Sequence, residues 1–219
     1  MDAPCSSHYC VSGADKLRPF MKTVTVLLYE GVDEMDFCGP LEVLASCRKV
    51  VEGKRTDKPA FHVETIAARV GSIRCAHGLQ VLPDKSVQQA LEADIILVPG
   101  GPGARIESNV SLLLLEYLAK STATAEMLAS VCTGAFIVAR CGLADGRRLA
   151  THHAATEELA RQYPRVHVVS GQRVVTDGND LISSAGISAG IDLALALVER
   201  YEGREAARMT ARRMEWPGS

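Results

Sequence analysis

The chain lacks the cysteine pattern that would assign it at once to a metal-binding or disulfide-rich class. It has seven cysteines, and no two of them form the C-x-x-C pair typical of zinc sites and redox dithiols. An odd number also cannot form the fully paired framework of a secreted domain. We therefore expect a protein of the reducing cytoplasm.

Long apolar runs and an excess of charge of one sign are also missing. No stretch approaches the roughly 20 apolar residues that cross a bilayer, and residues 1–20 lack the apolar core of a signal peptide. Lys+Arg 24 against Asp+Glu 26 leaves a formal net charge of -2, so no basic field would attract nucleic acid or an anionic membrane. A small-molecule ligand fits this composition, whereas nucleic acid and membranes are not expected as partners.

The pattern along the chain predicts one α/β domain over residues 21–219, preceded by a flexible extension over 1–20. Short apolar runs alternate with helical stretches, which is typical of a mainly parallel sheet covered by helices. Strands are expected over 23–29, 61–67, 94–98, 148–151 and within 123–131 and 166–182, with a hairpin or edge strands over 71–81. Helices are expected over 41–51, 106–120, 134–141 and 155–163, followed by two helices within 186–213 that break near Gly203.

Cys132 stands between an expected strand and an expected helix, in the stretch ASVCTGAFIVA. Small residues two positions away on either side, Ser130 and Gly134, suit the sharp turn called a nucleophile elbow, with serine in place of the usual first glycine. The N-terminus of the following helix favours a thiolate and is expected to lower the pKa of this cysteine. The alternative is a buried core cysteine.

A glycine-rich segment follows the strand expected over 94–98. Ligand sites commonly form at the carboxyl ends of parallel strands. In Pro99-Gly100-Gly101-Pro102-Gly103, the N–H groups of Gly100 and Gly101 are expected to form an oxyanion hole with that of Thr133. The alternative is a plain structural turn. A dinucleotide-binding motif built on Gly101 and Gly103 would need a third glycine at position 106, which is Ile106.

Asp36 follows the first strand, between Met35 and Phe37. Pro40 suits the first position of a helix, which would place Asp36 in the preceding loop. A carboxyl in apolar surroundings has a raised pKa and can exchange a proton near neutral pH. Asp33 and Glu34 are expected to be solvated, and the alternative role for Asp36 is helix capping.

His152 comes just past another short strand, beside His153. It is a candidate for lining the substrate site, and the alternative is a polar residue that is satisfied locally. Two adjacent histidines point in different directions and lack a nearby third ligand, so no metal site is expected here.

Together these segments resemble the ThiJ/PfpI superfamily of the class I glutamine amidotransferase-like fold, from Met21 to about Trp216. The resemblance rests on Met35-Asp36, Pro99-Gly100-Gly101, Cys132-Thr133-Gly134, Thr151-His152 and the segment SAGISAGID at 184–192. Asp36 followed by Gly39-Pro40, with Cys-Thr-Gly at the elbow, looks most like the isonitrile hydratase branch. Threonine at 133, where protease-like members carry histidine, disfavours peptidase activity.

The resemblance implies a flavodoxin-like three-layer sandwich and a homodimer, with no cofactor. It implies Cys132 as the nucleophile, Asp36 as the acid/base and Thr133 as a positioning group, in a lyase that converts isonitriles to N-substituted formamides. Two alternatives remain. One is a redox- or carbonyl-stress protein of the glyoxalase or deglycase type that uses the same cysteine. The other is a ligand-sensing domain related to AraC-type transcription regulators; the basic run at 208–213 is too short to replace their DNA-binding region and is interpreted as a solvated face.

Overall fold

The computed structural model describes residues 21–217, and the extension predicted over 1–20 lies outside them. Seven strands form the central sheet in the order β12-β13-β9-β8-β1-β4-β7. All neighbours are parallel except β12, which is antiparallel to β13. The strands are β1 (Lys22–Leu27), β4 (Phe61–Ala67), β7 (Lys85–Ser86), β8 (Ile95–Val98), β9 (Met127–Val131), β12 (Val174–Asp177) and β13 (Leu181–Ser184).

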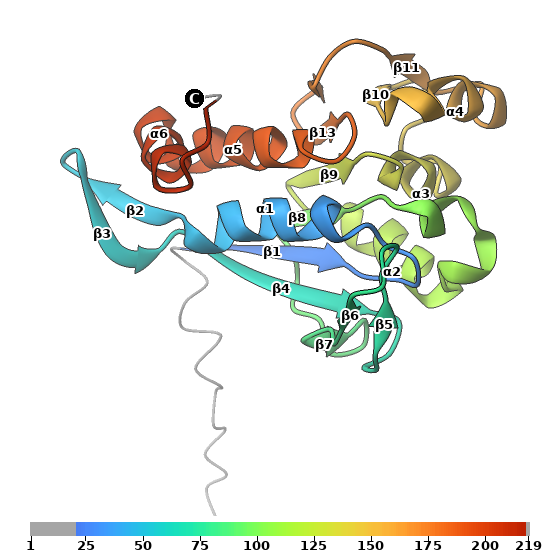
Figure 1. The fold of residues 1–219 in the computed structure, drawn as a ribbon, viewed down its shortest axis with the longest axis horizontal. Coiled ribbons are helices and arrows are strands. Elements are labelled where there is room, and N and C mark those ends of the chain that lie inside the picture. The colour runs from blue at the N-terminus through green and yellow to red at the C-terminus, as the bar shows by residue number, and fades with distance from the viewer. Residues whose placement is uncertain (1–20, 218–219) are drawn as a thin grey trace, which may run out of the picture.

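The centre of the sheet is buried on both faces, which explains why its strands are nearly continuous apolar runs. All four side chains of β8 are fully buried, as are Val24 and Val26 of β1. Helix α1 (Glu34–Ser46) packs against α5 (Ala189–Glu202), which in turn packs against α6 (Arg204–Arg213), whereas α2 (Leu112–Thr122) and α3 (Gly134–Arg140) lie apart from them (Figure 1). The predicted flavodoxin-like α/β fold with a mainly parallel sheet is confirmed.

Smaller elements surround this sheet. A parallel pair, β10 (Arg148–Ala150) and β11 (His167–Val169), is connected through α4 (Thr156–Gln162). The predicted hairpin is present as β5 (Ile73–Arg74) and β6 (Gln80–Val81). A further hairpin, β2 (Arg48–Val51) and β3 (Lys54–Pro59), projects from the body of the molecule (Figure 1). Short 3₁₀ helices cover Pro102–Arg105, Glu107–Asn109 and His153–Ala155.

The helix predicted over 41–51 is wrong in both bounds. Asp33 is the N-cap of α1, and its carboxylate accepts the N–H of Met35 at 3.0 Å, so the helix begins seven residues earlier. Pro40 therefore lies inside the helix, where it has no N–H to give to the carbonyl of Asp36 one turn earlier. The end of the predicted helix is instead strand β2.

The helix predicted over 106–120 also starts later. Ser111 is its cap and accepts the N–H of Leu113 at 3.2 Å, while the preceding residues form the two 3₁₀ turns. The predicted break near Gly203 is confirmed, since this residue separates α5 from α6 with a φ of 87° that favours glycine.

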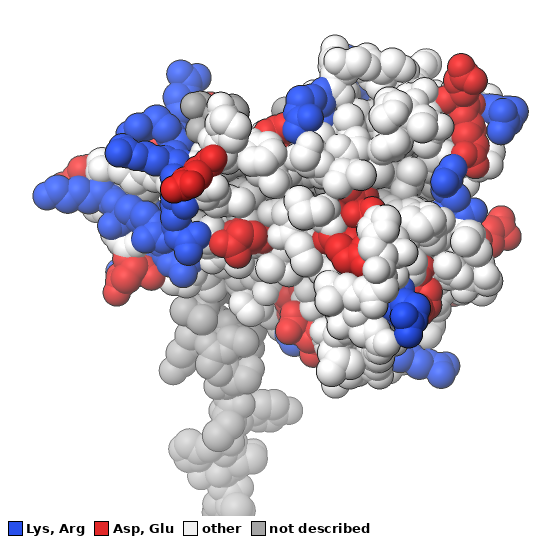
Figure 2. Space-filling view, viewed as in Figure 1, with Lys and Arg blue, Asp and Glu red and all other residues white. Residues whose placement is uncertain are grey.

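Basic side chains gather on the surface over the β2–β3 hairpin and α6 (Figure 2). Two of the α6 arginines form ion pairs: Arg208 pairs with Glu205 on the same helix, and Arg213 pairs with Glu42 of α1. The run at 208–213 is thus a solvated face with surface ion pairs, as expected. No helix within residues 21–217 is long and apolar enough to span a membrane.

Candidate active site

Cys132 occupies the turn between the last residue of β9 and the first residue of α3. Its φ of 56° lies in the left-handed region, which costs a residue with a Cβ about 1–3 kcal/mol. The turn is tight: a Cβ at Gly134 would lie 2.2 Å from the carbonyl oxygen of Val98. The strained strand-to-helix elbow predicted from the sequence is therefore present.

Asp36 is fully buried in the first turn of α1, and the structure brings its carboxyl into direct interaction with the Cys132 thiol. Its Oδ2 accepts the N–H of Gly100 at 3.1 Å, while Oδ1 is buried without a hydrogen-bond partner of good geometry among the described residues. Burial, and next the charge of Asp33, raise the pKa of Asp36 to about 7; the thiol and the N–H groups of Gly100 and Ile187 oppose this rise. The predicted raised pKa has the right direction, but the predicted loop position is wrong, because Asp33 starts the helix.

The pKa of Cys132 is raised, not lowered as the sequence suggested. Burial, and next the charge of Asp36, raise it to about 12, against the N–H groups of Thr133 and Ile187. The effect of the helix N-terminus on this pKa is outweighed because Cys132 is only 6% exposed and its thiol faces the carboxyl of Asp36. Thiol and carboxyl therefore titrate as a pair, and a thiolate forms when its proton passes to Asp36.

The glycine turn after β8 holds the two groups beside the cysteine. The N–H of Gly101 donates to the Oγ1 of Thr133 at 2.8 Å, and this hydroxyl donates back to the Gly101 carbonyl at 2.8 Å. A Cβ at Gly100 would lie 2.5 Å from the Thr133 nitrogen and 2.6 Å from Asp36 Oδ2, so only glycine fits. Because Gly100 donates to Asp36 and Gly101 to Thr133, neither N–H is free for a substrate oxygen. The predicted oxyanion hole at these glycines is wrong.

Ile187 is a site residue that the sequence analysis missed. Its N–H faces both Asp36 and Cys132, and its φ of 52° is rare for a β-branched residue. The segment 184–192 was noted only for its family resemblance, since Ile187 has no reactive side chain and contributes only its backbone N–H. The one local signal was Gly186 directly before it.

A buried tyrosine, also not anticipated, anchors the glycine turn from the other side. The Tyr29 hydroxyl donates to the Pro99 carbonyl at 2.6 Å, and burial holds the pKa of Tyr29 well above its usual value. This contact connects the end of β1 to the turn that positions Asp36 and Thr133.

The side chain of His152 contacts the backbone at Ala154 and Gly186 and forms no hydrogen bond with Cys132. Its Nδ1 accepts the N–H of Ala154 at 3.2 Å, and its ring fills the space above Gly186, where a Cβ would lie 2.2 Å from Cδ2. Burial, then His153 and Arg105, lower the pKa of His152. It lines a cavity that adjoins the elbow.

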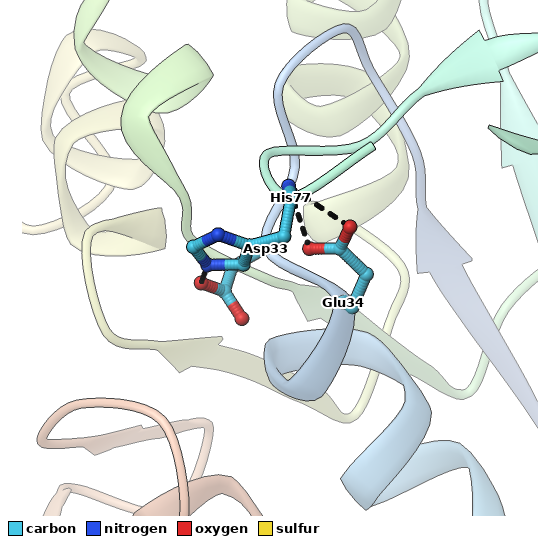
Figure 3. Close-up of side chains that lie close together, drawn as sticks. All are labelled: Asp33, Glu34 and His77. Carbon is cyan, nitrogen blue, oxygen red and sulfur yellow. Dashed lines mark hydrogen bonds and ion pairs between the residues drawn. The ribbon is translucent and has the colours of Figure 1, made fainter. Parts of the chain in front are cut away.

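Asp33, Glu34 and His77 form a further cluster at the start of α1, with potential ligand atoms within 4.8 Å of one another (Figure 3). The Glu34 oxygens accept the N–H of His77 at 2.9 and 3.2 Å, and the Nε2 of His77 lies 3.3 Å from Asp33 Oδ2. These contacts fasten the β5–β6 hairpin to the helix start. Asp33 and Glu34 were predicted to be solvated; Asp33 is instead buried as the helix cap.

Comparison with known proteins identifies the family. The DJ-1/PfpI family matches residues 22–200. The chain belongs to this family. It is 31% identical over 193 residues to isonitrile hydratase of Pseudomonas putida, covering 87% of this chain and 76% of that protein.

Relatives of this chain in the DJ-1/PfpI family include a transcriptional regulator as well as an enzyme. The HTH-type transcriptional regulator GbdR of Pseudomonas aeruginosa is 34% identical over 66% of this chain, but the match spans only 38% of the regulator. Among solved structures, a ThiJ/PfpI family protein from Pseudomonas syringae superimposes with a TM-score of 0.77 at 23% identity, covering 95% of this chain and 81% of that one. That last likeness concerns the fold alone.

Proposed function

We propose that this DJ-1/PfpI protein is an isonitrile hydratase-like lyase that uses Cys132 as nucleophile and Asp36 as proton carrier. One observation carries the proposal: the thiol is in contact with a buried carboxyl that exchanges protons near neutral pH, while the glycine N–H groups beside it are already occupied. An isonitrile carbon needs a nucleophile and a proton, and its attack creates no oxyanion. Peptide or ester cleavage would need the free N–H donors that this turn does not offer.

The proposed first step forms a thioimidate. Asp36 takes the proton of the Cys132 thiol, the sulfur attacks the terminal isonitrile carbon, and Asp36 returns the proton to that carbon. The product of this step is Cys132–S–CH=N–R, in which one S–C and one C–H bond have formed. The N–H groups of Thr133 and Ile187 face the sulfur and stabilise the developing thiolate.

Water completes the proposed reaction. Asp36 takes a proton from a water molecule as its oxygen attacks the thioimidate carbon, and the nitrogen gains that proton. The C–S bond then breaks, the sulfur regains a proton from the hydroxyl, and the products are R–NH–CHO and free Cys132. Thr133 acts as a positioning residue, since both hydrogen bonds of its hydroxyl go to Gly101.

Two other functions stay open as alternatives. A sensor role is supported by the similarity to the regulator GbdR. A redox or carbonyl-stress role would use the same cysteine and would need the same thiolate, so the raised pKa of Cys132 does not separate this role from hydration. The family resemblance supports a homodimer that acts on a small molecule in the cytoplasm.

The deciding experiment measures formamide production from a panel of isonitriles and, in parallel, the alkylation rate of Cys132 across pH. We expect Cys132→Ala to be inactive because no covalent adduct can form, and Cys132→Ser to be nearly inactive because a hydroxyl is barely ionised. Rapid alkylation of the wild-type protein without formamide would favour the redox or carbonyl function. Slow alkylation with the pH dependence of an ordinary thiol, again without formamide, would leave a binding domain.

A further inference from the structure

A cavity of about 480 Å³ adjoins the elbow and is not explained by the reaction at the thiol. Two of its lining residues also contact Cys132: the Thr151 hydroxyl donates to the Cys132 carbonyl at 2.9 Å, and the Ile187 N–H faces the sulfur. The cavity is thus placed to hold the part of a substrate that does not react.

The lining of this cavity is rich in hydrogen-bond donors and, in the part of the chain that the structure describes, contains no Asp or Glu. His152 and Arg173 are two of these donors. A site with donors and without carboxylates selects a substituent that accepts hydrogen bonds, and most strongly one with negative charge.

The state of His152 follows from its contacts. Because Nδ1 accepts the N–H of Ala154, the proton of the neutral ring lies on Nε2. Burial and the neighbouring His153 lower the pKa of His152, so this neutral form prevails near pH 7. His152 is therefore a donor at the cavity wall.

Arg173 supplies the positive charge of the lining, which the ion pair with Asp192, outside the lining, partly offsets. Its Nε pairs with Asp192 at 2.5 Å and its Nη2 donates to the Ser188 hydroxyl at 3.3 Å, while Nη1 makes no hydrogen bond among residues 21–217. These two contacts orient the guanidinium and leave one edge of the fork for a ligand. An oriented guanidinium binds a carboxylate better than a freely moving one does.

We propose that this cavity binds an anionic substituent of the substrate through Arg173 and His152, so that the substrate class is isonitriles that carry a carboxylate. The proposal rests on the function proposed above for its reacting group, but the anion preference of the cavity can be measured without turnover.

The first test compares alkylation of Cys132 by iodoacetate and by neutral iodoacetamide, measured on the Cys132 peptide by mass spectrometry. Removing the charge in Arg173→Gln should lower the iodoacetate rate about fivefold, the effect of one partly exposed charge pair, and leave the iodoacetamide rate unchanged. Arg173→Lys should keep most of the preference. Arg208→Gln is the matched control, because Arg208 pairs with Glu205 on exposed α6 and does not line the cavity. Equal effects of Arg173→Gln on both reagents would overturn the proposal.

The second test uses turnover and binding of isocyanoacetate and its methyl ester. Arg173→Gln should raise KM for the acid about fivefold, with kcat unchanged, and leave both constants for the ester unchanged. In Cys132→Ala, isocyanoacetate should alter the fluorescence of Trp216, the single tryptophan, whose Nε1 donates to Asp192 at 2.8 Å beside Arg173.

The two proposals fail in different ways. If no isonitrile gives formamide but the iodoacetate preference depends on Arg173, the hydratase function is wrong and the anion site stands. If formamide forms equally well from acid and ester in wild type and Arg173→Gln, the anion site is wrong and the hydratase stands.

Discussion

Replacing Asp36 by asparagine should remove most of the activity and at the same time stabilise the folded protein above neutral pH. The loss of activity follows because an amide cannot carry a proton between thiol, carbon and water, a contribution typically worth about 10²–10⁴-fold. The gain in stability follows because the fold holds an ionisable carboxyl with no access to water and with Asp33 nearby.

The magnitude can be worked out from the pKa of Asp36, which rises from 3.8 to about 7 on folding. That difference of about 3 units corresponds to about 4 kcal/mol, at about 1.4 kcal/mol per unit. Below about pH 4 the carboxyl is protonated in the folded and unfolded states alike, so Asp36 does not lower the free energy of unfolding. As the pH rises toward about 7 the unfolded chain ionises first, so the free energy of unfolding falls, and above that pH the full cost is present.

The amide introduced by Asp36→Asn never ionises, so the free energy of unfolding of the variant does not fall with pH in this way. It should be similar in stability to wild type near about pH 4 and more stable by up to about 4 kcal/mol near about pH 8. Urea unfolding at a series of pH values, followed by Trp216 fluorescence, measures the difference. Asp57→Asn, which changes an exposed carboxyl on β3, is the control and should show no such trend. An Asp36→Asn variant that is less stable than wild type at about pH 8, or equally offset at every pH, would refute the reasoning.

Three further predictions concern the same site. The kcat/KM of isonitrile hydration should rise with pH through about 7 as Asp36 becomes able to accept the thiol proton, and a pH-independent profile would contradict this role. Thr133→Val should lose activity to an extent between Asp36→Asn and Cys132→Ala and destabilise the fold by about 1–3 kcal/mol, because it leaves the Gly101 N–H unpaired and the Gly101 carbonyl with the N–H of Ala104 alone; Thr133→Ser should be nearly neutral in both assays. Gly100→Ala should reduce activity strongly, since its Cβ would displace the nitrogen of Thr133 and the carboxyl of Asp36. Gly203→Ala meets no atom within 4 Å, and should cost about 1–3 kcal/mol of backbone strain but leave the kinetics unchanged.

The order of elements and the elbow were predictable from the sequence, because both are local. The apolar run at 95–98 and the stretch 127–131 indicate buried parallel strands, and a cysteine between such a strand and a helix indicates the turn at Cys132. The start of α1 was mispredicted because two local signals competed, Pro40 as a first residue and Asp33 as a cap. The cap determines where the helix begins, and its contact with Met35 is visible only in the structure.

Other properties of the site depended on contacts between distant segments. Asp36, Gly100 and Cys132 come from three strand ends, and only the parallel arrangement of β1, β8 and β9 brings them together. Whether a backbone N–H is free or occupied, as at Gly101, depends on a side chain more than thirty residues away.

The sequence by itself determined the fold class and the candidates Cys132 and Asp36, because residue type, glycine placement and hydrophobic period are properties of short segments. Only the tertiary structure decided what those residues can do. A pKa depends on burial and on charges within a few ångströms, so the helix terminus predicted a lowered pKa for Cys132, whereas its burial against Asp36 raises it.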